Sequence, residues 1–140
     1  MEGTLIVEFS SLNYLAILLA GLSGYVLGAL WYSRTGFGKT WLKRMGLEGD
    51  DLEEPIGPMA LAMLSSLIKA FALALVVQAF GAKSFLDGAG VGLLIGLGLN
   101  ATSIFSDHLF GQWDFQLFVI RAGYQVCFST LAGGILGFWR

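Results

Sequence analysis

The sequence predicts an all-α integral membrane protein, a four-helix transmembrane bundle with a short interfacial amphipathic helix between the first and second spans. Its 140 residues are 56% hydrophobic and 13% charged, and the mean hydropathy of +0.73 is too high for one soluble domain of this size. Whole windows of about 20 residues are apolar on every side, the length that crosses the hydrocarbon core of a bilayer. No stretch alternates with period two, so helices rather than a closed barrel satisfy the backbone in lipid. We treat residues 1–140 as a single membrane domain.

The first span is expected over residues 12–32, with glycines on one face. Gly24 and Gly28 form a GxxxG pair, a spacing that lets two helices approach closely. Two interpretations stay open: a dimerisation face between two copies, or close packing within one chain. Residues 1–11 contain no Lys or Arg, unlike the basic start of a secretory signal, so we expect this span to be retained.

Residues 35–47 predict an amphipathic helix that lies in the headgroup layer. Apolar residues recur there every four positions and basic residues form a second row, a pattern typical of a helix on a membrane surface. The basic row either binds anionic lipid, at about 1 kcal/mol per cation, or forms a solvated face that only fixes topology. The residues of this lipid-facing basic helix are Lys39, Trp41, Lys43 and Arg44.

Three further spans follow an acidic linker at residues 48–54. They are expected over residues 59–80, 87–106 and 115–139, with a turn at residues 108–114 between the last two. Of the six Lys and Arg residues outside the spans, four lie on the side of the loops after the first and third spans, and Lys83 and Arg140 lie on the other side. Because cytoplasmic loops carry an excess of these residues, we expect the first loop in the cytoplasm and both termini outside. The expected location is the cytoplasmic membrane of a prokaryote.

The third and fourth spans each carry glycines and polar residues along one face. Residues three and four apart stack on a helix, and small residues let two helices hydrogen-bond across a close contact. The face of the third span holds Gly88, Gly92, Gly96, Asn100, Ser103 and Asp107, and that of the fourth holds Arg121, Gln125, Ser129, Ala132, Gly133 and Gly137. The predicted helix-packing glycines are Gly24, Gly28, Gly92, Gly96, Gly133 and Gly137.

Lys69 lies near the middle of the second span, where insertion costs some 2.5 to 3.5 kcal/mol and a lysine is expected to face the bundle interior. At a rise of about 1.5 Å per residue, Lys69 and Gln125 lie at one depth, while Asn100 and Arg121 lie at another. These depths predict two polar layers capped by Asp107. The predicted polar cluster consists of Lys69, Asn100, Ser103, Asp107, Arg121 and Gln125.

Two interpretations of this cluster stay open. In the first, Lys69 and Arg121 line a cavity for an anionic solute or lipid headgroup, because the single acid Asp107 does not balance two cations. In the second, Arg121 pairs with Asp107 while Lys69 snorkels or donates to backbone carbonyls, and the cluster only fixes helix register.

The pattern of residues 24–33 and 37–43 resembles that of the small four-helix membrane proteins called domain of unknown function 1761. The resemblance covers nearly the whole chain and implies four spanning helices, without established catalytic residues. Arg121 stands where we expect Asn in the pattern. The segments that carry the resemblance are GYVLGALWYS at 24–33, FGKTWLK at 37–43 with Gly46, LFG at 109–111, LFVI at 117–120, AGY at 122–124 and GILGFW at 134–139.

The expected function is that of a non-enzymatic multi-pass membrane protein, a homo-oligomer assembled through its glycine faces, with a structural or lipid-interacting role. A small transporter or channel subunit for a small or anionic solute is the alternative. Asp107, His108 and Asp114 lack a recognisable metal-ligand spacing, and a lone interfacial histidine is usually solvated. We expect membrane lipids as partners and no metal, cofactor, catalytic site or nucleic-acid partner.

Overall fold

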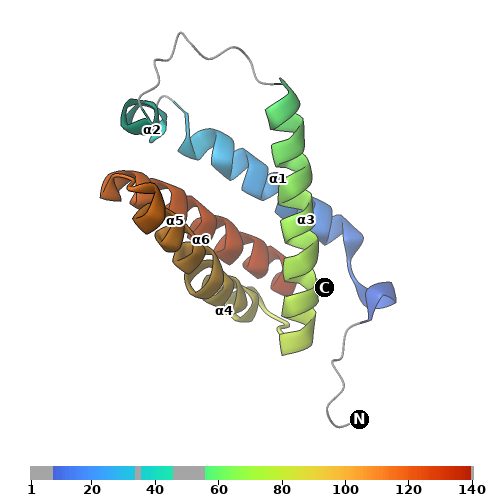
Figure 1. Ribbon diagram of the computed structural model, residues 1–140. Coiled ribbons are helices and arrows are strands. Elements are labelled where there is room, and N and C mark those ends of the chain that lie inside the picture. Colours follow the sequence, from blue (N-terminus) through green and yellow to red (C-terminus); the bar gives the residue numbers. More distant parts are fainter. Residues whose placement is uncertain (1–7, 34–35, 46–55, 140) are drawn as a thin grey trace.

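The computed structural model describes residues 8–33, 36–45 and 56–139, and every regular element in these ranges is a helix (Figure 1). Helices α4, η3 and α5 follow one another as one rod, in which η3 is a π-helical segment. The predicted all-α fold is confirmed. The elements are η1 (Phe9–Ser11), α1 (Tyr14–Trp31), α2 (Gly38–Met45), α3 (Ile56–Phe80), α4 (Phe85–Ile95), η3 (Gly96–Ala101), α5 (Thr102–Gly111) and α6 (Phe115–Phe138).

Four helical stretches are long and apolar enough to cross a membrane, as the sequence predicts. Large apolar side chains stay exposed along them; Leu86 is 80% exposed and Phe110 is 90% exposed. Such an outer surface suits acyl chains rather than water. The four stretches are Tyr14–Trp31, Met59–Phe80, Phe85–Gly111 and Phe115–Phe138.

Two helix boundaries differ from the prediction. Helix α3 begins at Ile56, so Pro58 lies in its first turn, where a missing amide hydrogen leaves no helical hydrogen bond unmade. The third span continues past Ser106 to Gly111 and ends where Gln112 adopts the left-handed conformation with φ of 55°. The acidic linker and the outer residues of the predicted interfacial helix lie outside the described ranges.

A helix cap and hydrogen bonds between distant parts of the chain define the end of the bundle away from α2. The Asn13 side chain caps α1 by accepting from the amide of Ala16, and its Nδ2 donates to the carbonyl of Trp139 at 3.2 Å. Gln78 at the end of α3 exchanges hydrogen bonds with the backbone of Glu8. Both ends of the described chain therefore lie together, opposite α2.

Helix α2 packs beside the end of α1 and the turn from α5 into α6, at the other end of the bundle, which we call the α2 end (Figure 1). Helix α3 begins at this end too, apart from α2. The rings of Tyr32 and Trp41 meet edge to face at 5.7 Å, and Arg44 forms a 2.8 Å salt bridge with Asp114. The sequence-predicted amphipathic helix is thus present. Trp41 on its apolar side contacts Tyr32 at the end of α1, while Lys39 and Lys43 stay exposed.

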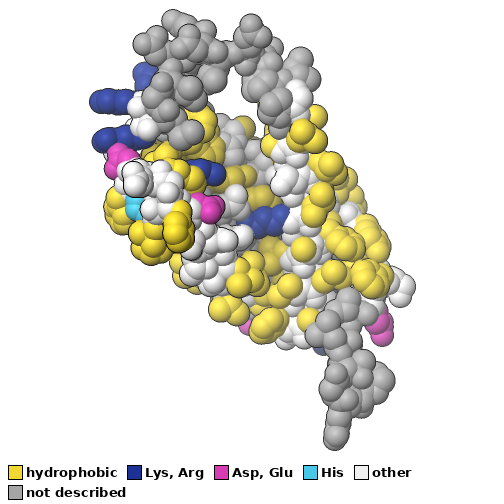
Figure 2. Space-filling view, viewed as in Figure 1, with side chains coloured by type: hydrophobic (Ala, Val, Ile, Leu, Met, Phe, Trp, Pro, Cys, Tyr) yellow, Lys and Arg dark blue, Asp and Glu magenta, His cyan; other side chains and the backbone are white. Residues whose placement is uncertain are grey.

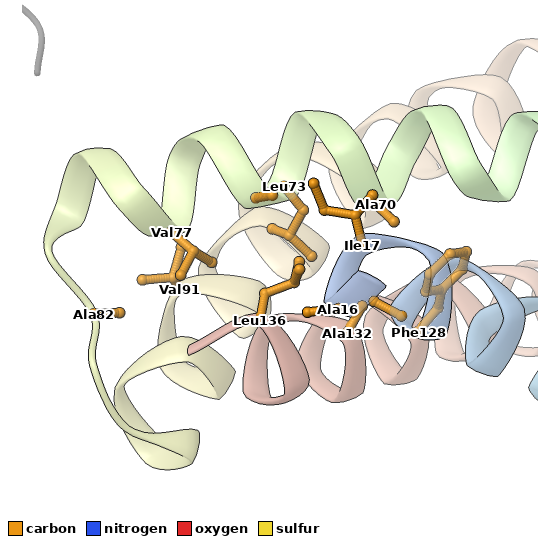
Figure 3. Packing of buried hydrophobic residues seen from close by; sticks show 12 residues of the cluster. Ala16, Ile17, Ala70, Leu73, Val77, Ala82, Val91, Phe128, Ala132 and Leu136 are labelled. Carbon is orange, nitrogen blue, oxygen red and sulfur yellow. The ribbon is translucent and has the colours of Figure 1, made fainter. Parts of the chain in front are cut away.

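The core lies between α1, α3, α4 and α6 and is built mostly from small and branched side chains. Figure 3 shows Ile17 of α1, Leu73 and Val77 of α3 and Leu136 of α6 packed in one cluster. Small residues in this layer allow the helices to approach closely where lipid supplies no hydrophobic force between them.

Glycines bring α4 and α6 into backbone contact, as their predicted faces imply. A Cβ at Gly92 would overlap the carbonyl oxygen of Ser129, and one at Gly88 would overlap that of Gly133. Gly24 packs under the ring of Phe128 in the same chain. These glycines therefore allow close packing of helices within one chain.

Replacing Gly92 with Ala is expected to lower the free energy of unfolding by about 1–3 kcal/mol, because the added methyl forces α4 away from the α6 backbone. Gly90 is the matched control: it lies on the same helix, and a Cβ there meets nothing within 4 Å. Unfolding in detergent, followed by helical circular dichroism, should leave Gly90→Ala within about 0.5 kcal/mol of wild type. Equal effects of the two changes would contradict the packing described.

Candidate functional site

A cavity of about 440 Å³ opens among α1, α3 and α6 toward the α2 end of the bundle. Figure 2 shows the molecule hollowed beside α3, with a basic side chain lying in the hollow. Small side chains of α3 and glycine on α1 leave the space unfilled. The lining residues are Tyr25, Gly28, Ala29 and Tyr32 from α1 and its end, Met59, Ala62, Ser65, Ser66 and Lys69 from α3, and Tyr124, Gln125 and Phe128 from α6.

Lys69 is the charged group of this cavity. Its Nζ donates a 2.6 Å hydrogen bond to Oε1 of Gln125 and lies 4.5 Å from the centre of the Phe128 ring. The predicted layer of Lys69 with Gln125 is therefore found. The ion pair formed within residues 8–33, 36–45 and 56–139 joins Arg44 to Asp114, so Lys69 has no carboxylate partner in these ranges.

Tyrosine rings form the wall that faces α1. Tyr32 and Tyr124 meet edge to face at 5.7 Å, and the Tyr124 hydroxyl donates to the carbonyl of Gly24 at 2.8 Å. That bond fixes the Tyr124 ring against Gly28, where a Cβ would lie 2.9 Å from the hydroxyl. Glycine on α1 thus makes room for the aromatic wall.

The sequence singled out Lys69 and Gln125 but missed these aromatic residues. Rings near the end of a spanning helix, such as that of Tyr32, are typical of the membrane interface and do not by themselves indicate a cavity. Tyr25 and Tyr32 are seven residues apart and Gly28 lies between them, so all three share one helix face. That spacing is the feature of the sequence from which the aromatic wall could have been predicted.

Asn100 lies on the far side of Lys69 and pairs with Ser129, not with Arg121. The Ser129 hydroxyl donates to Oδ1 of Asn100 at 3.2 Å. The predicted layer of Asn100 with Arg121 is wrong because the third span runs on to Gly111. Counted from Gly111, Asn100 lies one full helical turn deeper in the membrane than it does when the span ends near Asp107.

Ser103 and Asp107 are exposed rather than inside the bundle. The π-helical segment explains the difference, because a π turn holds one more residue than an α turn. The extra residue rotates the following chain by about 100°. Gly92, Gly96 and Asn100 keep facing α6, while Ser103 and Asp107 turn outward.

Arg121 stacks on the ring of Trp113, with 4.3 Å between its guanidinium carbon and the ring centre. This cation–π contact takes the place of the expected pairing with Asp107. Arg121 is also close enough to Tyr32 to interact with it electrostatically. It lies outside the cavity lining, so the two predicted cations do not share one cavity.

Basic side chains gather over α2, beside the mouth of the cavity, as Figure 2 shows for this face. Lys39 and Lys43 are exposed, and Arg44 is held by its bridge to Asp114. The basic helix predicted from the sequence therefore lies at the end of the bundle toward which the cavity opens.

His108 is not the solvated residue that the sequence led us to expect. Its ring lies among Phe105, Phe115 and Phe118, and its Nδ1 is buried without a hydrogen-bond partner in the described residues. No group of three metal-ligating side chains occurs in the described parts of the chain.

Replacing Gln125 with Leu is expected to cost about 1–3 kcal/mol of stability, because it leaves the Lys69 ammonium without its acceptor. Adding Lys69→Met to this change should recover part of the loss, since removing both partners leaves no unpaired polar group. Gln116→Leu, an exposed position on α6, is the matched control. Thermal unfolding in detergent of Gln125→Leu, Lys69→Met, the double variant and the control measures the coupling; purely additive losses would contradict it.

The comparisons with known proteins support the resemblance carried by the sequence. The model of the family described as "Protein of unknown function (DUF1761)" matches residues 15–137. No curated protein matches the chain, and no solved structure does. The family match spans all four membrane-crossing helices and the cavity between them. The chain therefore belongs to the family of proteins of unknown function DUF1761.

Proposed function

We propose that this protein is a non-enzymatic membrane protein that binds an anion in the cavity among α1, α3 and α6. The anion is a carboxylate or a phosphate. The observation that carries the proposal is the position of Lys69. Its ammonium lines a cavity of about 440 Å³ and contacts a neutral amide and an aromatic ring. The anion is either free in solution or the headgroup of a lipid.

The energetics of a cation inside a membrane support this proposal. A lysine at the centre of a spanning helix costs some 2.5 to 3.5 kcal/mol on insertion scales. The bond to Gln125 uses one of the three donors that an ammonium carries. A bound anion would accept from the remaining donors and neutralise the charge, so its binding offsets the cost of holding Lys69 there.

The walls of the cavity suit a compact anionic group with an apolar attachment. Ser65 and Ser66 on α3 and the hydroxyl of Tyr32 supply further hydrogen-bond donors around Lys69. The rings of Tyr124 and Phe128 supply apolar surface from α6. Orientation by a few polar groups within an apolar lining is typical of small-molecule sites.

Transport of a small or anionic solute is the second candidate. The same cavity supports it, since a carrier also needs an intramembrane site for its solute. We place binding first because Arg121 stacks on Trp113 outside the cavity, whereas a carrier path was expected to hold both cations. Flux into liposomes that is lost in Lys69→Leu would favour transport.

Homo-oligomerisation stays a proposal, with a weaker structural basis than the sequence suggested. Gly24, Gly92 and Gly133 contact other helices of the same chain. These glycine faces are therefore buried within one chain and are not exposed to a second copy. An oligomer would therefore use the exposed apolar faces, and light scattering with detergent subtraction measures the subunit number.

Lys69→Gln is expected to weaken anion binding about tenfold or more, because a hydrogen bond to a charged group contributes about 1.5–3 kcal/mol and 1.4 kcal/mol is a factor of ten. Calorimetric titration with inorganic phosphate, acetate and phosphatidylglycerol separates a free anion from a headgroup. The control is Lys83→Gln, an exposed lysine at the other end of the bundle. Lys69→Arg should retain binding, and wild-type affinity in Lys69→Gln would overturn the proposal.

The basic residues of α2 are expected to concentrate anionic lipid at the cavity mouth. Changing Lys39 and Lys43 to Gln should weaken enrichment of phosphatidylglycerol around the protein by about 1 kcal/mol per cation. Binding of inorganic phosphate by the cavity should not change in this double variant. Quenching of tryptophan fluorescence by brominated phosphatidylglycerol, against brominated phosphatidylcholine, measures the enrichment; identical quenching in variant and wild type would contradict a role for α2.

A further inference from the structure

A second space adjoins Lys69 on its other side, between α3 and η3. It has a volume of about 210 Å³, roughly half that of the cavity. We call it the lateral groove. Its lining residues are Lys69, Ala72, Leu73, Val76, Ile95, Leu99 and Asn100. Lys69 is the one residue shared by the lining of the lateral groove and that of the cavity.

The lateral groove is apolar away from its junction with the cavity. Val76, Ile95 and Leu99 line it, and the Oδ1 of Asn100 is engaged by the Ser129 hydroxyl. Leu99 is exposed on the outer surface of η3. Because α3 and η3 belong to membrane-crossing helices, the groove faces the layer that acyl chains occupy.

We propose that the occupant of the site is an anionic lipid, with its headgroup at Lys69 in the cavity and an acyl chain in the lateral groove. This inference rests on the proposed function and adds to it the chemical class of the ligand. A free phosphate or carboxylate would use the cavity alone. An anionic lipid uses both spaces, because the lysine that neutralises its headgroup lies at the start of an apolar groove open to the bilayer.

The charge on Lys69 determines which lipid is selected. The apolar groove by itself does not distinguish one acyl chain from another. Lys69 has no carboxylate partner in the described ranges, so an anionic headgroup gains an interaction there that a zwitterionic headgroup, whose own cation is repelled, does not. The groove should therefore hold the chain of phosphatidylglycerol in preference to that of phosphatidylcholine.

Photo-crosslinking tests this arrangement in vesicles that contain the full chain. Phosphatidylglycerol with a diazirine in its acyl chain should label peptides covering Ala72–Val76 and Ile95–Leu99 at least threefold more than the phosphatidylcholine analogue does. In Lys69→Gln this excess should disappear. The lipid-facing side of α1, with exposed Leu22 and Val26, is the internal control and should be labelled equally in every sample.

A variant that fills the lateral groove gives an independent readout. Ala72→Trp should abolish the excess labelling while leaving titration with inorganic phosphate unchanged, since Ala72 lines the groove and not the cavity. Ala60→Trp is the matched control, an exposed alanine of α3 that lines neither space.

The outcomes separate this inference from the proposed function. Phosphate binding that depends on Lys69, without excess labelling of the lateral groove, would overturn the lipid as occupant and leave anion binding intact. Loss of both would overturn both. Excess labelling that persists in Lys69→Gln would also overturn the inference, because the headgroup would then not select the lipid.

Discussion

The hydrogen bond between Lys69 and Gln125 is the interaction on which the arrangement of the bundle depends. A charged side chain within the hydrocarbon layer needs an acceptor supplied by the protein, because acyl chains supply none. Gln125 supplies it from α6 at 2.6 Å, and this fixes the register of α3 against α6. Phe128, one turn further along α6, places its ring 4.5 Å from the same ammonium. A neutral amide and a ring stabilise the cation without neutralising it, so its charge stays available to a ligand.

Glycine has opposite effects on the two sides of α6. Toward α4, Gly92 and Gly133 remove the side chains that would separate the backbones, and no space remains. Toward α1, Gly24 and Gly28 face the large rings of α6, which keep the helices apart at the α2 end. A cavity therefore forms beside α1, where rings meet glycine, and not beside α4, where glycine meets backbone.

The sequence predicted the fold and the central contact of the site, because both depend on quantities that a sequence carries. Hydropathy and length specify four spans, and counting residues from a common boundary brought Lys69 to the depth of Gln125. The same counting failed for Asn100, whose helix runs on to Gly111. It also failed for Asp107, because the sequence of Gly96–Ala101 gives no sign that its turn is π-helical. The tyrosine wall was missed because aromatic rings near helix ends are so often interfacial.

The π-helical segment bears directly on the charge of the site. An uninterrupted α-helix would keep Ser103 and Asp107 on the face of Asn100, since these positions follow it at helical spacing. That face is turned toward α6 and adjoins the groove beside Lys69. In an uninterrupted α-helix the Asp107 carboxylate would therefore lie on the same side of the bundle as Lys69. The extra residue of η3 directs Asp107 outward instead, and the Thr102 hydroxyl, 2.8 Å from the carbonyl oxygen of Gly98, accommodates the altered backbone. A local change in helix geometry thus turns Asp107 away from the face that adjoins Lys69, and π-helical turns of this kind occur frequently at functional sites.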